Sequence, residues 1–207
     1  MRPCSLCGAY GISTDCLHCR GSRSSIFSEL SEEDQVDLIK LDQARPGRPN
    51  PLAGRQAAFD AGKVPRVGLV GCGKSKLSVR ASARELYVGN LFRAALHHAE
   101  RTCDEVYILS ASYGLLHLNS IILPYDKPMI RLSRPDRAAW GHKVVGALLA
   151  LFPVMRVTFD VYAGEAYVEP LENAVAIEGG SWTLNTPLEG LTLGRRLRYF
   201  KEARPAS

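Results

Sequence analysis

From residue 66 onward, short apolar runs alternate along the chain with longer stretches of helical periodicity. The apolar runs predict strands over 67–70, 106–109, 157–162 and 174–177. The periodic stretches predict helices over 86–101, 133–152, 165–173 and 191–203. Alternating strands and helices are typical of α/β proteins. We therefore predict an α/β domain over residues 66–207, a three-layer α/β/α arrangement around a four-stranded, mainly parallel sheet.

The first residues of the chain carry a different pattern. Two Cys-x-x-Cys pairs, separated by eight residues, are formed by Cys4, Cys7, Cys16 and Cys19. Each pair can place two thiolates on one side of a tetrahedral zinc ion. The alternative is two disulfides, which an intracellular chain disfavours. Because four cysteines leave no open coordination position for water, the predicted zinc is structural rather than catalytic.

The segment between the cysteines and the α/β domain divides into two parts. Residues 31–43 predict a short helix that begins at a capping serine and has acidic residues in its first turn. Residues 44–65 are rich in proline and glycine, which is typical of a linker. We therefore predict a small zinc-ribbon-like module with a short helix over 1–43, and a linker over 44–65.

Composition and charge narrow the class of protein. The chain is 46% apolar and 23% charged, as in ordinary soluble proteins, and no stretch approaches the roughly 20 apolar residues of a membrane span. The N-terminus lacks the apolar segment of a signal peptide, so a cytoplasmic location is expected. Residues 1–65 hold 8 basic and 8 acidic side chains, against 18 and 13 in the remainder. The net charge of +5 therefore belongs to the α/β domain.

Basic residues recur in three groups within that domain, over 74–84, 127–137 and 195–201. Such groups favour contact with the phosphates of a nucleic acid, although solvated surfaces give the same pattern. We therefore predict a nucleic acid as the partner.

Ligands of open parallel sheets bind outside the carboxyl ends of the strands. Here that rule selects the loops over 71–75, 110–126, 163–167 and 179–190. The loop over 110–126 is seventeen residues long, and loops of such length are commonly functional.

The first of these loops contains a phosphate-loop pattern. Gly68 to Ser75 fits G-x-x-x-x-G-K-S, which is typical of nucleotide-binding phosphotransferases. However, Gly68 lies inside the predicted strand, and no helical pattern follows Ser75. A narrower prediction is an anion-binding loop, whose alternative is a plain glycine turn with an exposed lysine. Its predicted ligand-binding residues are Gly71, Cys72, Gly73, Lys74 and Ser75.

The long loop carries the candidate catalytic residues. Asp126 is the carboxylate best placed to stabilise charge or activate a water molecule, with Tyr125 beside it. Ser110, Tyr113 and Gly114 are further candidates for substrate binding, because tyrosine rings can stack on a base and serine can donate a hydrogen bond. The alternative is that the tyrosines fill the edge of the core.

The third loop repeats this logic after the strand over 157–162. Gly164 allows close approach of a ligand, and Glu165 or Tyr167 can reach the same edge of the sheet. Glu165 can equally serve as an acidic residue in the first turn of its helix.

These motifs together resemble an uncharacterised family of bacterial and phage proteins over roughly residues 66–203. The resemblance rests on Gly-Cys-Gly-Lys-Ser-Lys76, Ser-Ala-Ser-Tyr-Gly-Leu-Leu116, Pro-Tyr-Asp126, Ala-Gly-Glu-Ala-Tyr167 and Pro-Leu-Glu-Gly-Leu191. The Gly-Leu-Leu to Pro-Tyr-Asp segment is more remotely similar to the uracil-DNA-glycosylase-like domains of archaeosine-pathway enzymes. That similarity implies a four-stranded parallel sheet and chemistry at an N-glycosidic bond. Uracil is not the expected base, because the histidine-containing loop of uracil-DNA glycosylases has no counterpart here.

The resulting hypothesis is an N-glycosylase or base-exchange enzyme that acts on a modified base, in DNA rather than tRNA, in anti-phage defence or nucleic-acid modification. Two alternatives remain open. A zinc-ribbon protein would bind nucleic acid without catalysis, and a phosphotransferase would use Lys74 and Ser75 to hold a triphosphate.

Overall fold

The computed structural model describes residues 64–152, 156–178 and 181–202. The predicted zinc-ribbon-like module, with Cys4, Cys7, Cys16 and Cys19, lies outside these residues, as does the linker up to residue 63. No helix within the described residues is both long and apolar enough to cross a membrane.

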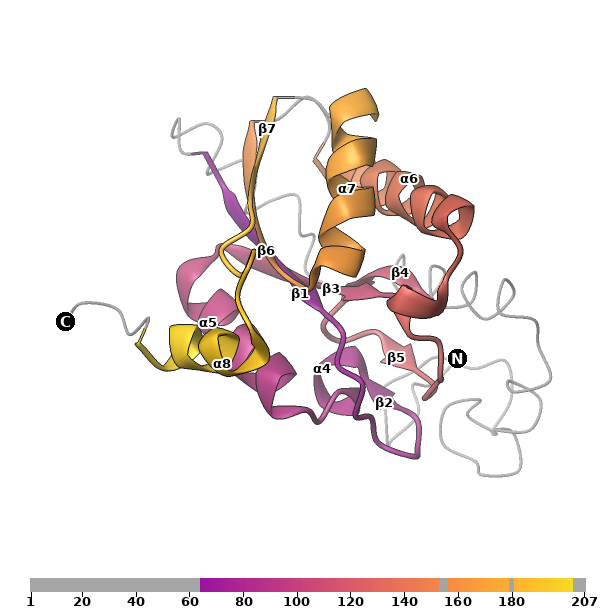
Figure 1. Cartoon of the computed structure of the whole chain (residues 1–207), viewed down its shortest axis with the longest axis vertical. Coiled ribbons are helices and arrows are strands. Elements are labelled where there is room, and N and C mark those ends of the chain that lie inside the picture. Colours follow the sequence, from indigo (N-terminus) through magenta and orange to yellow (C-terminus); the bar gives the residue numbers. More distant parts are fainter. Residues whose placement is uncertain (1–63, 153–155, 179–180, 203–207) are drawn as a thin grey trace, which may run out of the picture. The chain divides into compact units, whose positions relative to one another are not determined.

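A five-stranded sheet forms the centre of the domain (Figure 1). Its strand order is β4-β3-β1-β6-β7, and every neighbouring pair is parallel except β3 with β4. The bounds are β1 (Arg66–Gly71), β3 (Glu105–Ser110), β4 (Gly114–His117), β6 (Val157–Tyr162) and β7 (Trp182–Asn185). The α/β class and the mainly parallel sheet are therefore confirmed, whereas the predicted number of four strands is wrong.

Two elements account for that difference. The start of the seventeen-residue loop folds back on β3 as β4, because Gly114 adopts a φ of 79° and closes a tight turn. The predicted strand over 174–177 is instead the end of α7 (Glu165–Glu178), and the last parallel strand is β7. A short apolar run such as Ala-Val-Ala-Ile fits a helix as well as a strand.

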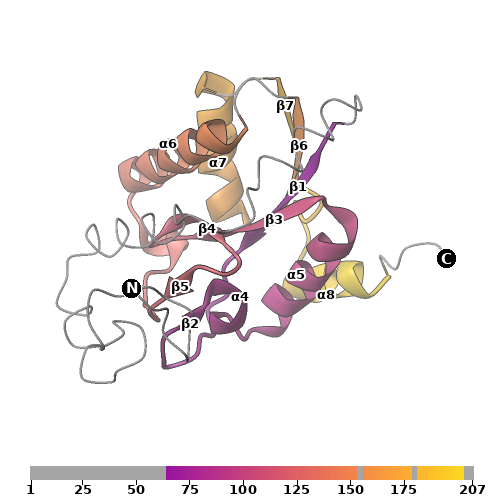
Figure 2. The same cartoon turned by 180° about the vertical axis from the view of Figure 1, so that it is seen from behind.

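Helices cover both faces of the sheet, as Figures 1 and 2 show from opposite sides. α6 (Arg134–Leu151) and α7 pack on one face, over a core that includes Leu69, Val144 and Phe159. α6 begins at the predicted cap, where the backbone N–H of Asp136 donates to Ser133 Oγ. Gly141 lets the two helices approach closely, since a Cβ at this position would lie 2.2 Å from the carbonyl oxygen of Pro170.

The opposite face is covered by α5 (Asn90–Thr102) and α8 (Leu193–Glu202). Gly68 of β1 lies against α5, where a Cβ would be 2.9 Å from that of Ala99. On this face the buried His98 ring packs edge-on against Tyr162 of β6 and Tyr199 of α8. Aromatic contacts therefore hold α8 on the domain.

A charged cluster lies on the same face of β6. Asp160 is 2% exposed, and its carboxylate accepts hydrogen bonds from Arg66 at 2.7 and 3.1 Å. Asn185 Nδ2 donates to its other oxygen at 2.8 Å, and the Cys103 thiol donates at 3.6 Å. These donors compensate the buried charge of Asp160. The group, which we call the Asp160 cluster, also links β1, β6 and β7.

A small lobe adjoins the sheet beyond β1 and β4. Its antiparallel strands β2 (Ala81–Ser82) and β5 (Ile121–Ile122) lie beside α4 (Ala83–Leu86). A 3-10 turn, η2 (Met129–Arg131), then leads into α6. This lobe carries residues 72–88 and 118–131, the segments that follow β1 and β4.

Candidate functional site

Three parallel strands end side by side. Gly71 of β1 is level with Leu109 of β3, and Val70 is level with Tyr162 of β6. A Cβ at Gly71 would lie 2.9 Å from that of Ala163, so the glycine allows the ends of β1 and β6 to approach this closely. Three of the four loops predicted from the carboxyl-end rule, over 71–75, 110–126 and 163–167, therefore converge on one edge of the sheet. The fourth prediction, over 179–190, is wrong, because this segment contains β7 and follows a helix rather than a strand.

A thiol, a serine hydroxyl and three phenols meet at that edge in a group that we call the Cys72 cluster: Cys72, Ser110, Tyr87, Tyr125 and Tyr167. Tyr125 lies at its centre, and its hydroxyl donates to Cys72 Sγ at 3.3 Å. The same hydroxyl lies 2.7 Å from Ser110 Oγ and 3.0 Å from Tyr87 Oη. Tyr167 Oη is hydrogen-bonded to Cys72 Sγ at 3.0 Å. The cluster thus joins β3, α7 and the two segments of the lobe, one of which begins with Cys72 directly after β1.

The phenols of this cluster are neutral. Burial is the main cause that raises the pKa of the Tyr87, Tyr125 and Tyr167 hydroxyls well above their usual range. They remain protonated near neutral pH and act as hydrogen-bond donors and acceptors. A neutral, planar group with polar edges matches such surroundings better than an anion does.

One cation stands over the cluster. The Lys76 ammonium lies 4.3 Å from the ring centroid of Tyr125 and 5.7 Å from that of Tyr87. A backbone bridge between Lys76 and Tyr87 fixes this arrangement, because it ties the segment after β1 to the end of α4. The predicted Lys74 and Ser75 are exposed beside it, and Gly73 is half-buried.

The candidate catalytic carboxylate lies next to the cluster in sequence. Asp126 is exposed and directly follows Tyr125. Within the part of the chain that the structure describes, no hydrogen bond or ion pair joins Asp126 to another residue. Its carboxylate is therefore available to a ligand at this edge.

Three of the predicted substrate-binding residues are buried and serve the fold rather than contact a ligand directly. Ser110 is fully buried and accepts the Tyr113 N–H at 3.1 Å, so it acts on a ligand only through Tyr125. Tyr113 is 7% exposed, with its ring edge-on against Tyr125, and it fills the core edge rather than presenting a flat face. Gly114 is buried in the turn before β4.

The third predicted loop begins α7. Gly164 is half-buried and accepts the first backbone hydrogen bond of the helix, from Tyr167 N–H. Glu165 is exposed in the first turn, where an acidic residue favours the helix dipole. Of this loop, Tyr167 is the residue that contacts the Cys72 cluster.

Comparison with known proteins places the chain in a family. Residues 67–202, most of the chain, match the family of unknown function DUF6884. The chain belongs to this family. No curated protein and no solved structure matches it. The likeness to uracil-DNA-glycosylase-like domains therefore stays a prediction.

The phosphate-loop pattern of this DUF6884 chain does not form a phosphate loop. Gly68 lies inside β1 and serves the contact with α5. After Ser75 the backbone runs antiparallel to residues 86–88, and the next helix begins only at Ala83. The strand–loop–helix arrangement that cradles a triphosphate is therefore absent from this described segment.

Three residues of the DUF6884 site were missed by sequence reasoning. Tyr87 and Lys76 enter through the bridge that joins their segments. Trp140 of α6 donates its indole N–H to the Ser110 carbonyl at 2.8 Å and packs edge-on against Tyr167. Their separation along the sequence hides these contacts, and the sequence marks Lys76 only as a member of the basic group over 74–84 and of the motif that ends with it.

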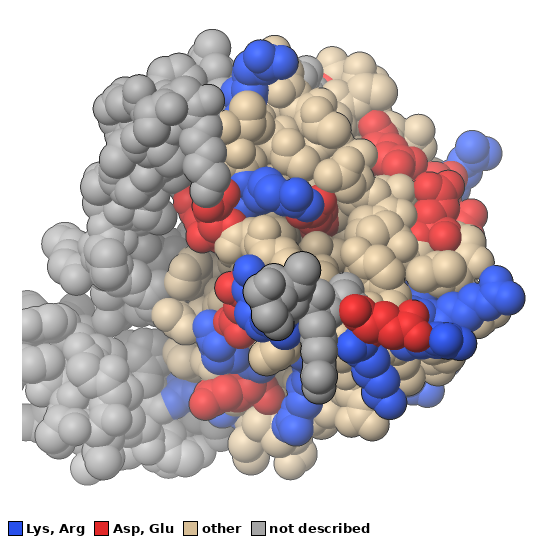
Figure 3. Space-filling model, turned by 90° about the vertical axis from the view of Figure 1, so that its left-hand side faces the viewer, with Lys and Arg blue, Asp and Glu red and all other residues tan. Residues whose placement is uncertain are grey.

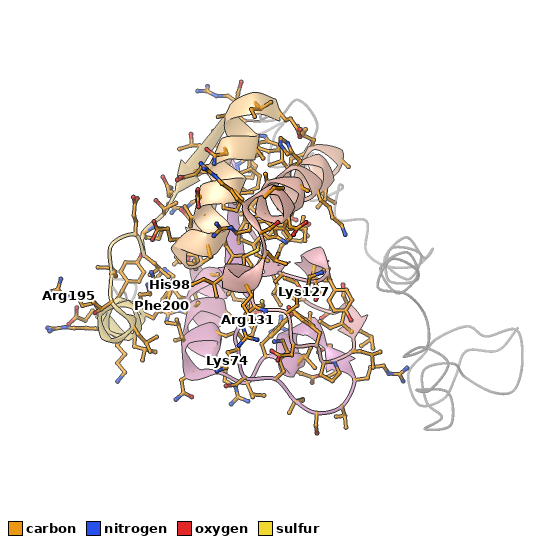
Figure 4. The ribbon with its side chains drawn as sticks, turned by 45° about the vertical axis from the view of Figure 1, so that its right-hand side comes forward. Lys74, His98, Lys127, Arg131, Arg195 and Phe200 are labelled. Atoms are coloured by element: carbon orange, nitrogen blue, oxygen red, sulfur yellow. The ribbon has the colours of Figure 1, made fainter. Side chains whose placement is uncertain are left out.

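The basic residues of the DUF6884 domain fall into two places. Lys74, Lys127 and Arg131 lie on the same side of the domain, whereas Arg195 lies apart on α8 (Figure 4). On the side of α8, basic and acidic side chains intermingle (Figure 3). The ion pair between Arg198 and Glu202 contributes to that mixture. The cations around the strand ends are therefore the candidates for phosphate contact, and they include Arg196 of α8, whose guanidinium lies against Gly164.

Proposed function

We propose that this edge of the sheet binds a nucleotide of a nucleic acid and cleaves, or exchanges, the N-glycosidic bond of a modified base. One observation carries the proposal. The exposed Asp126 follows Tyr125, whose hydroxyl is anchored through Cys72 and Ser110 to the ends of β1 and β3. The backbone that carries this carboxylate is thus held next to neutral polar groups that suit the edge of a base.

The reaction needs a carboxylate at this place. When the bond between C1′ and the base breaks, positive charge develops on the sugar. Asp126 would stabilise that charge and orient the attacking water molecule, or the incoming base in an exchange reaction. Cys72 and Tyr167 would offer a thiol and a phenol to the edge of the base. Gly73 would let the nucleotide backbone approach.

The surrounding charges support a nucleic acid as the substrate. Lys74 and Arg131 are exposed, and Lys127 is half-buried on the same side of the domain. They would contact phosphates on either side of a nucleotide that has turned out of its stack. DNA is the proposed substrate in preference to tRNA. The predicted structural zinc would hold a module that extends this contact.

The test is mass spectrometry of the free bases that the full-length protein releases from unmodified DNA, hypermodified phage DNA and tRNA. We expect one modified base to be released, and Asp126→Asn to slow its release by about 100- to 10,000-fold. Glu165→Gln examines the second carboxylate of the edge. Glu169→Gln, one turn further along α7 and also exposed, is the matched control.

Two results would contradict the proposal. Release of the base by Asp126→Asn at the wild-type rate would remove the assigned role of this carboxylate. No release from any of the three substrates, with binding of nucleic acid retained, would favour a binding protein without catalysis.

A further inference from the structure

Tyr125 has one charged neighbour in space and one of opposite sign in the sequence. Asp126 follows it in the chain, while the Lys76 ammonium stands 4.3 Å from the centroid of its ring. All other polar side chains that contact the Tyr125 hydroxyl are uncharged hydroxyls or a thiol. A ligand held against the Cys72 cluster therefore meets the ammonium of Lys76, and the exposed carboxylate of Asp126 is one residue away from Tyr125 along the chain.

Lys76 is also held in position more firmly than Lys74. It is half-buried, and its backbone pairs with that of Tyr87, whereas Lys74 is exposed. An ammonium has three N–H donors. In the described residues, the one hydrogen bond found from the Lys76 ammonium goes to the Lys74 carbonyl at 3.5 Å. Donors consequently remain for a ligand.

This arrangement matches the charge that an N-glycosidic bond separates when it breaks. The electron pair of the bond goes to the base nitrogen, and positive charge is left at C1′. The oxygen of water bonds to C1′, and the proton that water loses ends on the base nitrogen. Until that proton arrives, the base is an anion, and a fixed cation lowers its free energy.

We infer that Lys76 is a catalytic residue that stabilises the negative charge on the departing base, while Asp126 stabilises the sugar. The inference rests on the proposed function. It assigns a role to the second lysine of Gly-Cys-Gly-Lys-Ser-Lys76 and leaves Lys74 to contact a phosphate.

The test is single-turnover base release by the full-length protein, with saturating enzyme and a series of substrates whose departing bases differ in acidity. We expect Lys76→Met to slow release by about 100- to 1,000-fold for the least acidic base. The loss should shrink as the base becomes more acidic, because such a base needs less help to carry its charge. Lys76→Arg should retain most of the rate, since it keeps the charge.

Lys143→Met, which removes an exposed lysine from α6, is the matched control for net charge. Thermal unfolding of each variant separates loss of the fold from loss of catalysis. If Lys76→Met does not fold, Lys76→Arg still tests whether the positive charge is sufficient for catalysis. A wild-type rate in Lys76→Met, or an equal loss for every departing base, would overturn the inference alone. Absence of base release by the wild-type protein would overturn the proposed function as well.

Discussion

Two polar clusters on the same sheet differ in whether their charged groups have partners within the protein. In the Asp160 cluster, a buried carboxylate receives hydrogen bonds from Arg66, Asn185 and Cys103. In the Cys72 cluster, neutral phenols bond to one another and to a thiol, and the nearby charges of Lys76 and Asp126 have no ion-pair partner among the described residues. The first cluster is internally satisfied, whereas the second leaves charge available to a ligand.

This difference separates a structural role from a functional one. A buried charge persists only when its partners compensate it, so the partners of Asp160 tie three strands together. Charges at the edge of the Cys72 cluster remain hydrated without such partners. Stability should therefore depend more on the Asp160 cluster than on the Cys72 cluster, and activity should depend on Lys76 and Asp126.

The largest effect on stability is expected from Asp160→Ala. This change removes the acceptor of the Arg66, Asn185 and Cys103 hydrogen bonds, and it should lower the free energy of unfolding by about 3 kcal/mol. The measurement is urea denaturation. Asp126→Ala should change that free energy by less than about 0.5 kcal/mol, because Asp126 is exposed. Equal losses of unfolding free energy from Asp160→Ala and Asp126→Ala would contradict the proposed difference between the two clusters.

A smaller effect is expected from Tyr125→Phe. The buried Ser110 hydroxyl and the Cys72 thiol each lose a partner, at an expected cost of about 1–2 kcal/mol in the free energy of unfolding. Tyr199→Phe is the matched control, since that phenol lies partly exposed on α8 and should cost less than about 0.5 kcal/mol. A Tyr125→Phe protein as stable as the control would show that the hydroxyl network contributes little.

The smallest expected effect is a decline in the free energy of unfolding at alkaline pH. Burial is the main cause that raises the pKa of the Cys103 thiol from 9.0 to about 11. The unfolded chain loses this proton at lower pH than the folded one, so the thiol's contribution is complete below pH 9 and declines as pH rises towards 11. Because the residue is half-exposed, we expect the decline to be about 1 kcal/mol at most.

The measurement for this prediction is the free energy of unfolding at pH 8 and pH 10, for wild type and Cys103→Ser. The wild-type protein should lose more stability over that interval than the variant. The same decline in both proteins would assign it to other groups, such as the tyrosines.

Much of the fold follows from local pattern. β1, β3 and β6 are buried apolar strands, and they match three of the predicted strands closely. The start of α6 was also predicted, because a cap is formed by residues adjacent in sequence. β7 was missed because it is short and its residues alternate between half-buried and exposed, so it lacks an apolar run.

The candidate site was only partly predictable for the same reason. The carboxyl-end rule selected Cys72, Tyr125 and Tyr167, and the structure brings these three together. It does not show which tyrosine is buried: Tyr113 and Tyr125 both look suitable for stacking in the sequence, but Tyr113 packs into the core. Tyr87 and Lys76 depend on a backbone bridge, which has no local signature.

The crossing of α6 and α7 brings residues 141 and 170 together directly behind the Cys72 cluster, because Trp140 contacts both Ser110 and Tyr167. Any side chain at residue 141 would meet the carbonyl oxygen of Pro170 and push the helices apart. α7 carries Tyr167 in its first turn, so such a shift would reach the thiol of Cys72. A substitution at residue 141 can therefore alter this site without contacting a ligand. Because the clash is with a backbone oxygen, residue 141 should remain glycine among members of the family, whichever residue stands at position 170.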